Sequence, residues 1–542
     1  MSKNSSPLVL HNANFRRTWM FPRNIRRIYP WKIAQITSLL IEQLQNVSWV
    51  GNKTIQTSFT KALEASGLKT PGTQYDINSG GARTYLAQLK CLGIMFQRTD
   101  GTIWLTMAGE DLVNGRPPLP IMQKLILRHQ YPSAYSAMRN IKIHPAIKIK
   151  PFQFVCKFLL DTDIGFLSLD ELVIIIVYGH NDNCYNICKS KILKFRKGQP
   201  LISLINNKND DLYTPRTQDR SFENALKDVF DIANTCKNYL QGVCIIEEID
   251  KDNKKVYVLS QEIKQTVIQE LLENESYIDV NSEESFQRSY GTLEKIKDTR
   301  QLITSKSNKV SDGSHIIVAE FMKHCGQNLL VESSDEFVNA TAKNFGFSKD
   351  LILKTIQPFL ESSLSIYEST YLDISKGGQK SAIQFEKATC SLFRDVLLFD
   401  ARHTGQKVKK GGVGAFADIF IIALDKKHCA IIDAKASPRY YLSSDDYHKM
   451  VGNYIPNYMQ LSDGRKLILE FCTYVAGGFH GEINKKLKEI ECQTSIPASA
   501  ISSFDLLNIC KHKFAKSDQP KIRKWFSESK ILTATNKSKA FN

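Results

Sequence analysis

Long apolar stretches are missing from this sequence of 542 residues. The longest such run, residues 172–178, is far too short for a membrane-spanning helix, which needs about 20 apolar residues. Residues 1–6 do not begin a secretory signal. We therefore expect a cytoplasmic protein that does not bind a membrane.

Cys-x-x-Cys pairs are also missing, although the chain has 12 cysteines. Cys184 and Cys188, with His180 one turn earlier, have the spacing closest to that of a soft-metal site, but no fourth ligand stands near them. We interpret the cysteines as buried, reduced thiols, which fits a cytosolic enzyme.

Acidic residues do not occur in residues 1–41, and the whole chain carries a net charge of +17. A surplus of this size favours a polyanionic partner and speeds encounter with it. The acid-free arm alternates aromatic residues with arginines that suit DNA phosphate contacts, namely Arg16, Arg17, Arg23, Arg26 and Arg27. An equally good interpretation is a basic tail that its aromatic residues tether to the protein's own surface.

The sequence after this arm has the order of a winged-helix module. Helical periodicity over residues 33–44, 55–68 and 80–92 precedes two short strands that turn at Asp100 and Gly101. In the third helix, Arg83 can read guanine and Gln88 adenine, because these side chains match those base edges. The alternative is that both side chains face solvent.

A similar plan recurs over residues 148–275, which suggests tandem winged helices that clamp DNA or serve only as a scaffold. Residues 276–313 are polar and typical of a linker, and residues 315–364 are again helical. Because one core rarely supports a chain of this length, we expect several domains. Their expected limits are 1–147, 148–275, 276–365 and 366–542.

The most informative pattern is Asp418 followed at a distance by Asp433-Ala434-Lys435. Two apolar runs joined by a polar turn over residues 425–428 predict a buried hairpin, with both acids and the lysine at one rim of a sheet. Two carboxylates there repel each other unless a hard cation, Mg²⁺ above all, lies between them.

Such an ion polarises a phosphodiester and activates water, while Lys435 orients that water or neutralises charge on the phosphate. The pattern therefore indicates hydrolysis of a nucleic-acid backbone. The alternative is a chance Asp-x-Lys pair in a solvated turn.

Residues 385–507 resemble the cleavage domain of the FokI-like type IIS restriction endonucleases, in the PD-(D/E)XK superfamily. The matching segments are Phe385-Glu386-Lys387, Ala417-Asp418, Ile432-Asp433-Ala434-Lys435, residues 471–481 and residues 501–507. The resemblance implies that Asp418 and Asp433 bind metal, that Lys435 is the catalytic lysine, and that Glu386 holds a metal-bound water. Ala417 stands where the family has proline, which alters the turn but removes no ligand.

The N-terminal part resembles the recognition half of the AlwI and nicking N.BstNBI group. The similar segments are residues 100–110, 130–133, 147–155 and 167–172. The fold expected from these patterns is α/β plus mainly α: tandem winged-helix modules, a helical spacer and a C-terminal nuclease domain with a central mixed sheet. The shared segments are structural in type, so no base specificity carries over.

These resemblances imply a bacterial type II site-specific deoxyribonuclease that binds a short asymmetric double-stranded DNA site and cuts at a fixed offset outside it. They also imply Mg²⁺ as cofactor and functional pairing with a DNA methyltransferase. Since one catalytic centre cuts one strand, double-strand cleavage needs a second copy of the chain, sequential events or a partner subunit. Asp445 and Lys449 lie where the family's cutting domains pair, although an ordinary intrahelical ion pair explains them equally well.

Three other functions stay open at this point. A site-specific nicking endonuclease has the same active site without productive pairing. A winged-helix regulator explains the charge and the modules without catalysis. A structure-specific or repair nuclease uses the same acids without reading bases.

Overall fold

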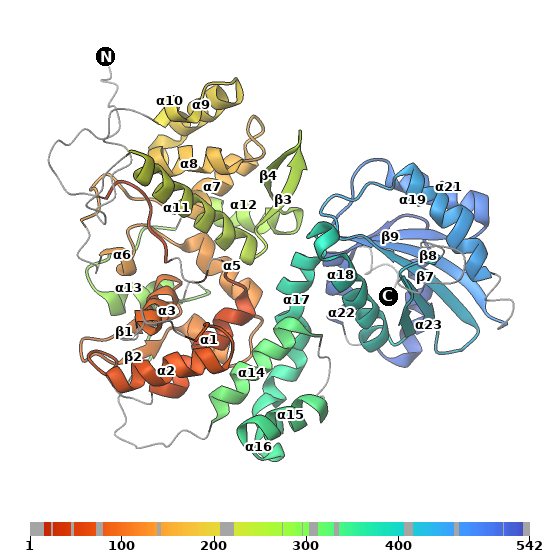
Figure 1. Cartoon of the computed structure of the whole chain (residues 1–542), viewed down its shortest axis with the longest axis horizontal. Helices are drawn as coiled ribbons and strands as arrows, with labels where there is room; N and C mark the ends of the chain where they lie inside the picture. The colour runs from red at the N-terminus through yellow and green to blue at the C-terminus, as the bar shows by residue number, and fades with distance from the viewer. Residues whose placement is uncertain are drawn as a thin grey trace. The chain divides into compact units, whose positions relative to one another are not determined.

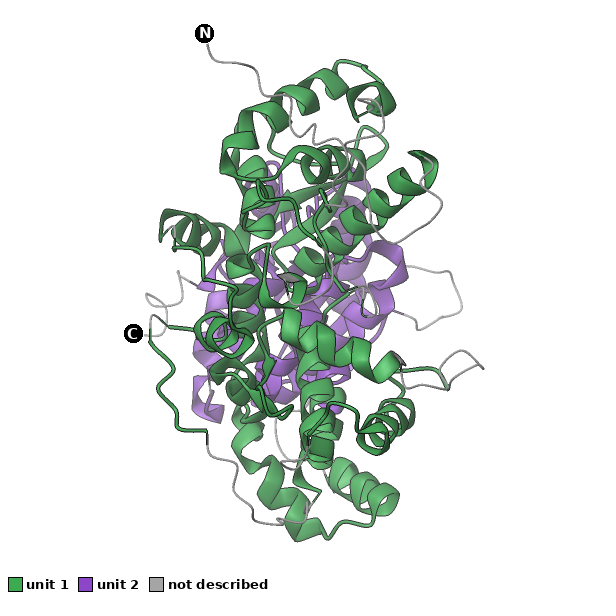
Figure 2. Cartoon of the chain, turned by 90° about the vertical axis from the view of Figure 1, so that its left-hand side faces the viewer, with its two compact units in different colours: residues 1–323, 334–362 green, residues 324–333, 363–542 purple. Residues whose placement is uncertain are grey.

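The computed structural model (Figure 1) describes residues 16–22, 25, 27–44, 48–71, 80–137, 142–205, 222–273, 275–294, 296–302, 313–329, 335–405, 416–459, 466–512 and 514–534. The chain forms two compact units, residues 1–323 with 334–362 and residues 324–333 with 363–542 (Figure 2). Across the described ranges, every helix falls short of the length and apolar character that crossing a bilayer requires.

The first unit begins with three helices and a hairpin, in the order expected from the sequence. Strands β1 and β2 are antiparallel, with Met95 opposite Leu105. Helix α2 starts at a side-chain cap, because the Ile55 amide donates to Asn52 Oδ1 at 3.2 Å. These elements are α1 (Pro30–Leu44), α2 (Lys53–Ala65), α3 (Gly80–Cys91), β1 (Met95–Gln97) and β2 (Ile103–Leu105). The winged-helix interpretation of this order stays a prediction.

Helices make up most of the rest of this unit, with one further antiparallel hairpin, β3–β4. They are α4 (Met107–Val113), α5 (Pro118–Arg128), α6 (Ala134–Ala137), α7 (Pro151–Leu160), α8 (Leu169–Tyr178), α9 (Tyr185–Arg196), α10 (Leu201–Ile205), α11 (Phe222–Gly242), β3 (Ile246–Lys251), β4 (Lys254–Leu259), α12 (Lys264–Glu273), α13 (Glu283–Tyr290), α14 (Ser314–Gln327), α15 (Asp335–Phe345) and α16 (Lys349–Ile356).

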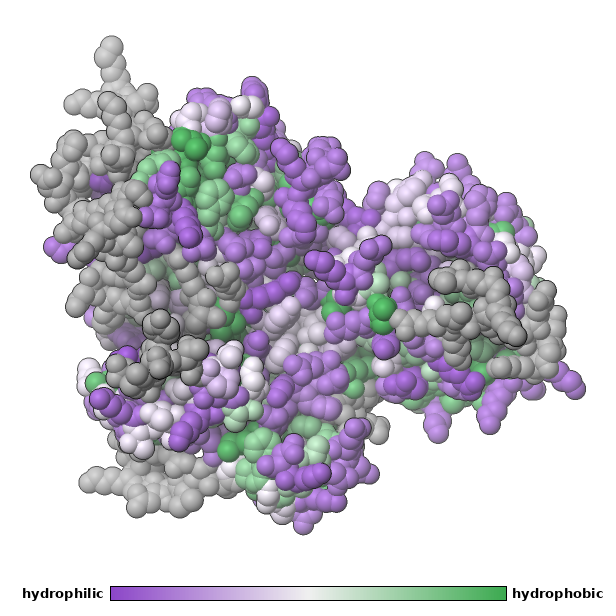
Figure 3. Space-filling model, viewed as in Figure 1, coloured by the Kyte–Doolittle hydropathy of each residue, from purple (hydrophilic) through white to green (hydrophobic). Residues whose placement is uncertain are grey.

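Helix α8 explains the longest apolar run of the sequence. Every residue from Leu172 to Tyr178 is buried, since α9, α10 and α11 pack around it. A helix that is apolar all round is stable only inside a core. Hydrophilic residues predominate on the face of each unit that Figure 3 shows.

The second unit is built on a six-stranded mixed sheet, which confirms the expected central sheet. The strand order is β10-β9-β8-β7-β6-β5. Strand β6 is antiparallel to both of its neighbours, β5 and β7, whereas β7 to β10 run parallel to one another. The strands are β5 (Asp400–His403), β6 (Ile419–Ile422), β7 (His428–Ala434), β8 (Ile468–Ala476), β9 (Ala498–Ser502) and β10 (Ile531–Leu532).

Helices and an apolar core flank this sheet. One face of β7 carries Cys429 and Ile431, which belong to a buried cluster with Met450, Tyr454 and Leu487. Because side chains alternate along a strand, Asp433 lies on this same face. The helices of the unit are α17 (Ser363–Ile374), α18 (Ala382–Ser391), α19 (Ser444–His448), η7 (Lys449–Tyr454), α21 (Ile483–Thr494), α22 (Ser503–Cys510) and α23 (Gln519–Phe526).

A buried carboxylate ties together several elements of the first unit. Asp298 accepts hydrogen bonds from Arg300 Nη2 at 2.7 Å and from Arg288 Nε at 3.1 Å. Arg288 lies on α13, and Arg300 also donates to the Leu105 carbonyl at the end of β2. Burial alone would raise the pKa of Asp298, but the hydrogen bonds from Arg300 and Arg288 outweigh it and hold that pKa well below its usual range.

We expect Asp298→Ala to destabilise the first unit by about 3 kcal/mol, because it removes the buried carboxylate that both guanidinium groups share. A depressed folded-state pKa contributes stability above the unfolded value of about 4 that is lost in acid, so the deficit should shrink as the pH falls. Thermal unfolding of the full chain at several pH values measures both effects. The control Asp163→Ala removes an exposed ion pair with Lys189 and should change stability by less than about 1 kcal/mol.

Candidate active site

The register between β6 and β7 places Asp418 opposite Asp433. Ile419 pairs with Ile432 across the two antiparallel strands, so the residue before Ile419 faces the residue after Ile432. Side chains directly opposite each other have Cβ atoms about 5 Å apart. The Ala434 amide donates to Asp418 Oδ2 at 2.9 Å, which links the two strands at the end of the hairpin away from its turn. The separation of the two acids in the sequence is therefore the one that this register requires.

The two carboxyl groups lie side by side, with Asp433 buried and Asp418 partly buried. Asp433 is only 1% exposed. Burial, and then the negative charge of Asp433, raise the pKa of Asp418 well above its usual value. Within the described part of the chain, Asp433 Oδ1 is buried and has no hydrogen-bond partner. A cation between the carboxylates would both satisfy this oxygen and remove the repulsion.

Lys435 supplies a positive charge beside this pair. Its Nζ atom lies 2.9 Å from Asp433 Oδ2 and 4.0 Å from Asp446 Oδ1. Its backbone amide donates to the Val475 carbonyl at 2.7 Å, which fixes the residue at the end of the β7–β8 pairing. Burial alone would lower the pKa of Lys435, but the charges of Asp433 and Asp418 outweigh it and raise that pKa, so the ammonium stays charged.

Glu386, on α18, lies close to Asp418 and is held by His403. The His403 Nε2 and Glu386 Oε2 atoms are 2.7 Å apart. A Cβ atom added at Gly405 would lie 2.8 Å from Asp418 Oδ1 and 3.5 Å from Glu386 Oε2, so both acids border the same small space. His403 was not foreseen from the sequence, since only the β5–β6 pairing brings it beside α18.

The donor set fits a hard divalent cation held by a pair of carboxylates. Among the described residues, no group of three or more His, Cys, Asp or Glu side chains forms a ready-made metal cluster. Asp418 and Asp433 are oxygen ligands, and backbone carbonyls and water complete the coordination shells of such cations. The unpartnered Asp433 Oδ1 and the space that Gly405 leaves open support this assignment.

Asp446 is a second residue that the sequence did not single out. It lies on α19, one position after Asp445, and accepts a hydrogen bond from the Tyr440 hydroxyl at 2.9 Å. Lys449 pairs with Asp446 at 3.6 Å, so the intrahelical partner of Lys449 is Asp446 rather than Asp445. Asp445 and Lys449 are both exposed. The adjacent acids Asp445 and Asp446 were the feature of the sequence from which this residue could have been found. The i,i+4 spacing of a helix, however, favoured Asp445 as the partner of Lys449.

Residues 16–22 pack on the first unit, which favours the tethered-tail interpretation for Arg16 and Arg17. Arg16 is 3% and Arg17 is 4% exposed. The Arg16 side chain donates to the carbonyls of Thr18 and Trp19, both at 3.1 Å. Arg27 is half-buried, with its guanidinium over the Tyr29 ring. Arg23 and Arg26 lie outside the described residues.

The expectation that Gln88 reads a base is wrong. Its side chain is fully buried and donates to the Ile25 carbonyl and the Tyr239 hydroxyl, both at 3.1 Å. Its amide oxygen accepts from the Ile25 amide at 3.2 Å. Gln88 therefore anchors the arm to α3 and α11, because a buried amide must satisfy its hydrogen bonds inside the protein.

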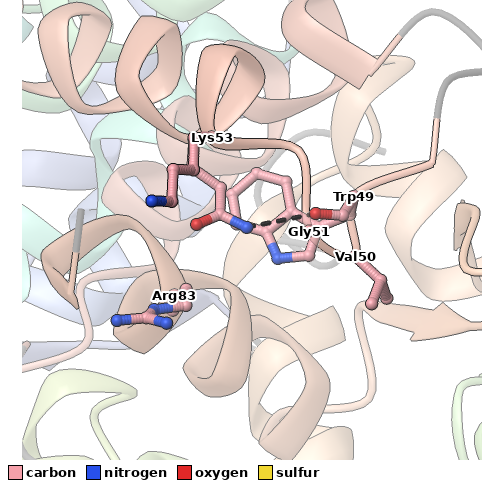
Figure 4. Close-up of a pocket in the computed structure, with 6 residues that line it drawn as sticks. Trp49, Val50, Gly51, Lys53 and Arg83 are labelled. Carbon is pink, nitrogen blue, oxygen red and sulfur yellow. Dashed lines mark hydrogen bonds between the residues drawn. The ribbon is translucent and has the colours of Figure 1, made fainter. Parts of the chain in front are cut away.

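Arg83, one turn earlier on α3, is exposed and lines a pocket of about 490 Å³ (Figure 4). The other lining residues are Trp49, Val50, Gly51, Lys53 and Gln56. Gln56 Nε2 donates to the Trp49 carbonyl at 3.1 Å, which ties α2 to the floor of the pocket. Neither Arg83 nor Lys53 forms an ion pair with any residue that the structure describes.

Comparison with known proteins identifies the second unit. Residues 346–533 match the family described as "FokI, cleavage domain". This segment contains the whole sheet and the cluster formed by Asp418, Asp433, Lys435 and Glu386. The segment is therefore similar to the FokI cleavage domain, which supports that resemblance. The AlwI-like resemblance of the N-terminal part stays a prediction.

Two solved structures are similar over most of the chain. They are "Structure of restriction endonuclease FokI" and the same enzyme "bound to DNA", each at 11% identity and a TM-score of 0.27. The first match covers 94% of this chain and 100% of the other, and the second covers 92% and 97%. No curated protein matches the sequence.

We expect Asp418→Asn to stabilise the metal-free protein while removing its response to Mg²⁺. At neutral pH the unfolded Asp418 is ionised, whereas the folded one is held towards its neutral form, so this group costs stability that asparagine does not. The melting temperature of the second unit should rise by at least about 2 °C, the shift that 1 kcal/mol produces in a unit of this size. Calorimetry with and without Mg²⁺ measures both effects.

An exposed acid on α21 provides the matched control. Glu489→Gln should leave both the metal-free melting temperature and the Mg²⁺ response as in the wild type. A lower melting temperature for Asp418→Asn, together with an unchanged Mg²⁺ response, would show that the carboxyl pair is not a cation site.

Proposed function

We propose that this protein is a type IIS restriction endonuclease that uses a divalent cation, Mg²⁺ above all, to hydrolyse phosphodiester bonds of double-stranded DNA. The observation that carries the proposal is the Asp418–Asp433 pair, with Lys435 beside it, inside a domain that matches the FokI cleavage family. A purely structural role does not explain two neighbouring carboxyl groups, one buried and one partly buried, at the end of a hairpin.

Each side chain at the site has a role in this chemistry. Asp418 and Asp433 would hold the cation, which when bound polarises the phosphodiester and activates a water molecule. Lys435 places its ammonium where it neutralises charge that develops on the phosphate. Glu386, oriented by His403, lies where it can hold a water molecule by hydrogen bonding.

The first unit supplies the DNA contacts in this proposal. Arg83 and Lys53 are two exposed cations at one pocket, and within the described residues neither is neutralised by a carboxylate. The pocket is large enough for a sugar and its phosphate, and Trp49 and Val50 give it an apolar floor. Phosphate contact through Arg83 therefore replaces base reading by Gln88 as the proposed use of α3.

The finer features of a type IIS enzyme complete the proposal. Recognition by the first unit and hydrolysis by the second would give cleavage at a constant offset outside an asymmetric site. Pairing of two copies on DNA, with Asp445 and Lys449 exposed at the surface of each, would give a double-strand break. In a cell such an enzyme works beside a DNA methyltransferase that protects the host site.

We expect Asp433→Ala to abolish cleavage, by at least about 10³-fold, while DNA binding survives, because the substitution removes a cation ligand and no DNA contact. Plasmid digestion with Mg²⁺, followed by mapping of the ends, measures cleavage, and a gel-shift assay in Ca²⁺ measures binding. Glu482→Gln, an exposed acid of the same unit, is the control and should cut like the wild type.

The wild-type digest separates the competing functions. Discrete linear fragments with a constant offset support the proposal. Nicked circles alone identify a nicking enzyme, and smears identify a nuclease that does not read bases. Intact plasmid in the presence of Mg²⁺ would leave a DNA-binding regulator and contradict the proposal.

We expect the double variant Lys53→Ala, Arg83→Ala to bind DNA more weakly on every sequence and to lower the slope of log affinity against log salt by about 2, one unit for each phosphate contact. Fluorescence anisotropy over a range of salt concentrations measures this. A loss confined to the cognate site, with an unchanged slope, would instead assign Arg83 to base reading. Unchanged affinity would remove the pocket from the DNA interface.

A further inference from the structure

Asp446 lies where the active site meets the surface helix α19. The residue belongs to the first turn of that helix, and its amide donates to Ser443 Oγ at 3.1 Å. Its side chain is 20% exposed, so the carboxylate is largely enclosed. Two ammonium groups approach its Oδ1 atom, Lys449 at 3.6 Å from the surface and Lys435 at 4.0 Å from the active site.

Tyr440 fixes the orientation of this carboxylate. The Tyr440 hydroxyl donates to Asp446 Oδ2 at 2.9 Å, which leaves Oδ1 to the two lysines. The tyrosine is itself held by its backbone, because its amide donates to the Gly478 carbonyl at 2.8 Å and its carbonyl accepts from the His480 amide at 3.1 Å. Asp446 is therefore a pre-oriented group rather than a mobile surface acid.

Lys435 lies between two carboxylates that differ in one respect. Asp433, at 2.9 Å, is the residue proposed to bind the cation, whereas Asp446 is not part of the carboxylate pair. A carboxylate that coordinates a divalent ion attracts a neighbouring ammonium less, and the ion itself repels that ammonium. A lysine side chain has four flexible methylene groups and needs a fixed partner to keep its head in one place.

We propose that Asp446 is a positioning residue that holds the Lys435 ammonium at the reacting phosphate when a cation at Asp433 weakens the attraction of that carboxylate for the ammonium. This inference rests on the proposed nuclease function. Lys435 bridges Asp433 and Asp446. With a cation bound at Asp433, Asp446 would be the anchor that remains for the ammonium, and Tyr440 holds that anchor in place.

Burial alone would raise the pKa of Asp446, but Lys435, Tyr440 and Lys449 together outweigh it and lower that pKa. The residue is consequently an anion at neutral pH, as an anchor for an ammonium must be.

Asp446→Asn tests the proposal, because it keeps an oxygen acceptor for Tyr440 and removes only the charge. We expect the single-turnover cleavage rate at saturating Mg²⁺ to fall about ten-fold, since a loosely held lysine is less often in place. DNA affinity in Ca²⁺ should not change. Cation affinity, measured by calorimetry without DNA, should fall by about 2–5-fold. Without the charge of Asp446, the Lys435 ammonium pairs only with Asp433 and competes more strongly with the cation for that carboxylate.

Two further variants make the result specific. Asp446→Glu restores the charge and should recover part of both losses, which a packing role of Asp446 would not allow. Glu489→Gln removes an exposed charge from α21 and should leave all three measurements unchanged. Melting temperatures of each variant within about 2 °C of the wild type confirm intact folding.

The outcomes separate this inference from the function on which it rests. Wild-type protein that does not cut DNA with Mg²⁺ overturns the proposed function. Wild-type protein that cuts, together with Asp446→Asn that cuts equally fast at saturating Mg²⁺, overturns only the role of Asp446. Reduced rates in both Asp446→Asn and Asp446→Glu, with unchanged cation affinity, also overturn it.

Discussion

The antiparallel register of β6 on β7 is the constraint on which the rest of this account depends. It sets Asp418 against Asp433 and gives the pair a backbone donor in the Ala434 amide. A shift of that register by one residue would turn one of the acids to the other face of the sheet. The apolar side chains of the hairpin, buried on both faces, fix the register and therefore keep Asp418 opposite Asp433.

Placing two carboxyl groups side by side in a buried site costs stability, and the surrounding side chains show how the fold offsets that cost. Lys435 lies against Asp433, and Glu386 is turned towards His403. The site is thus arranged to bind a cation, and these contacts reduce the repulsion between the carboxyl groups when no cation is bound. The same arrangement leads outward through Asp446 to Lys449 on the surface, so Lys435 and an exposed helix share one carboxylate.

The sequence was sufficient to predict the structural features that depend on a local pattern of residues. Two short apolar runs and a polar turn predicted the hairpin and the meeting of Asp418, Asp433 and Lys435. It could not reveal contacts between distant segments: His403 reaches Glu386 through strand pairing, and Gln88 is buried by Tyr239 from a helix far along the chain. Helical spacing likewise could not tell that the carboxylate of Asp446, rather than Asp445, is turned towards Lys435. Which side chains become buried depends on tertiary packing, and the periodicity of a single sequence does not predict that packing.

The most direct test of the claim that Asp418 and Asp433 bind a cation is an anomalous difference map from crystals of the full chain soaked in Mn²⁺. This ion substitutes for Mg²⁺ and is located by its anomalous X-ray scattering. The account predicts a peak within coordination distance of carboxylate oxygens of both Asp418 and Asp433, and none in crystals of a variant that lacks both acids. Full occupancy of Mn²⁺ elsewhere in the protein with no peak at this pair, or the two side chains turned to opposite faces of the sheet, would contradict it.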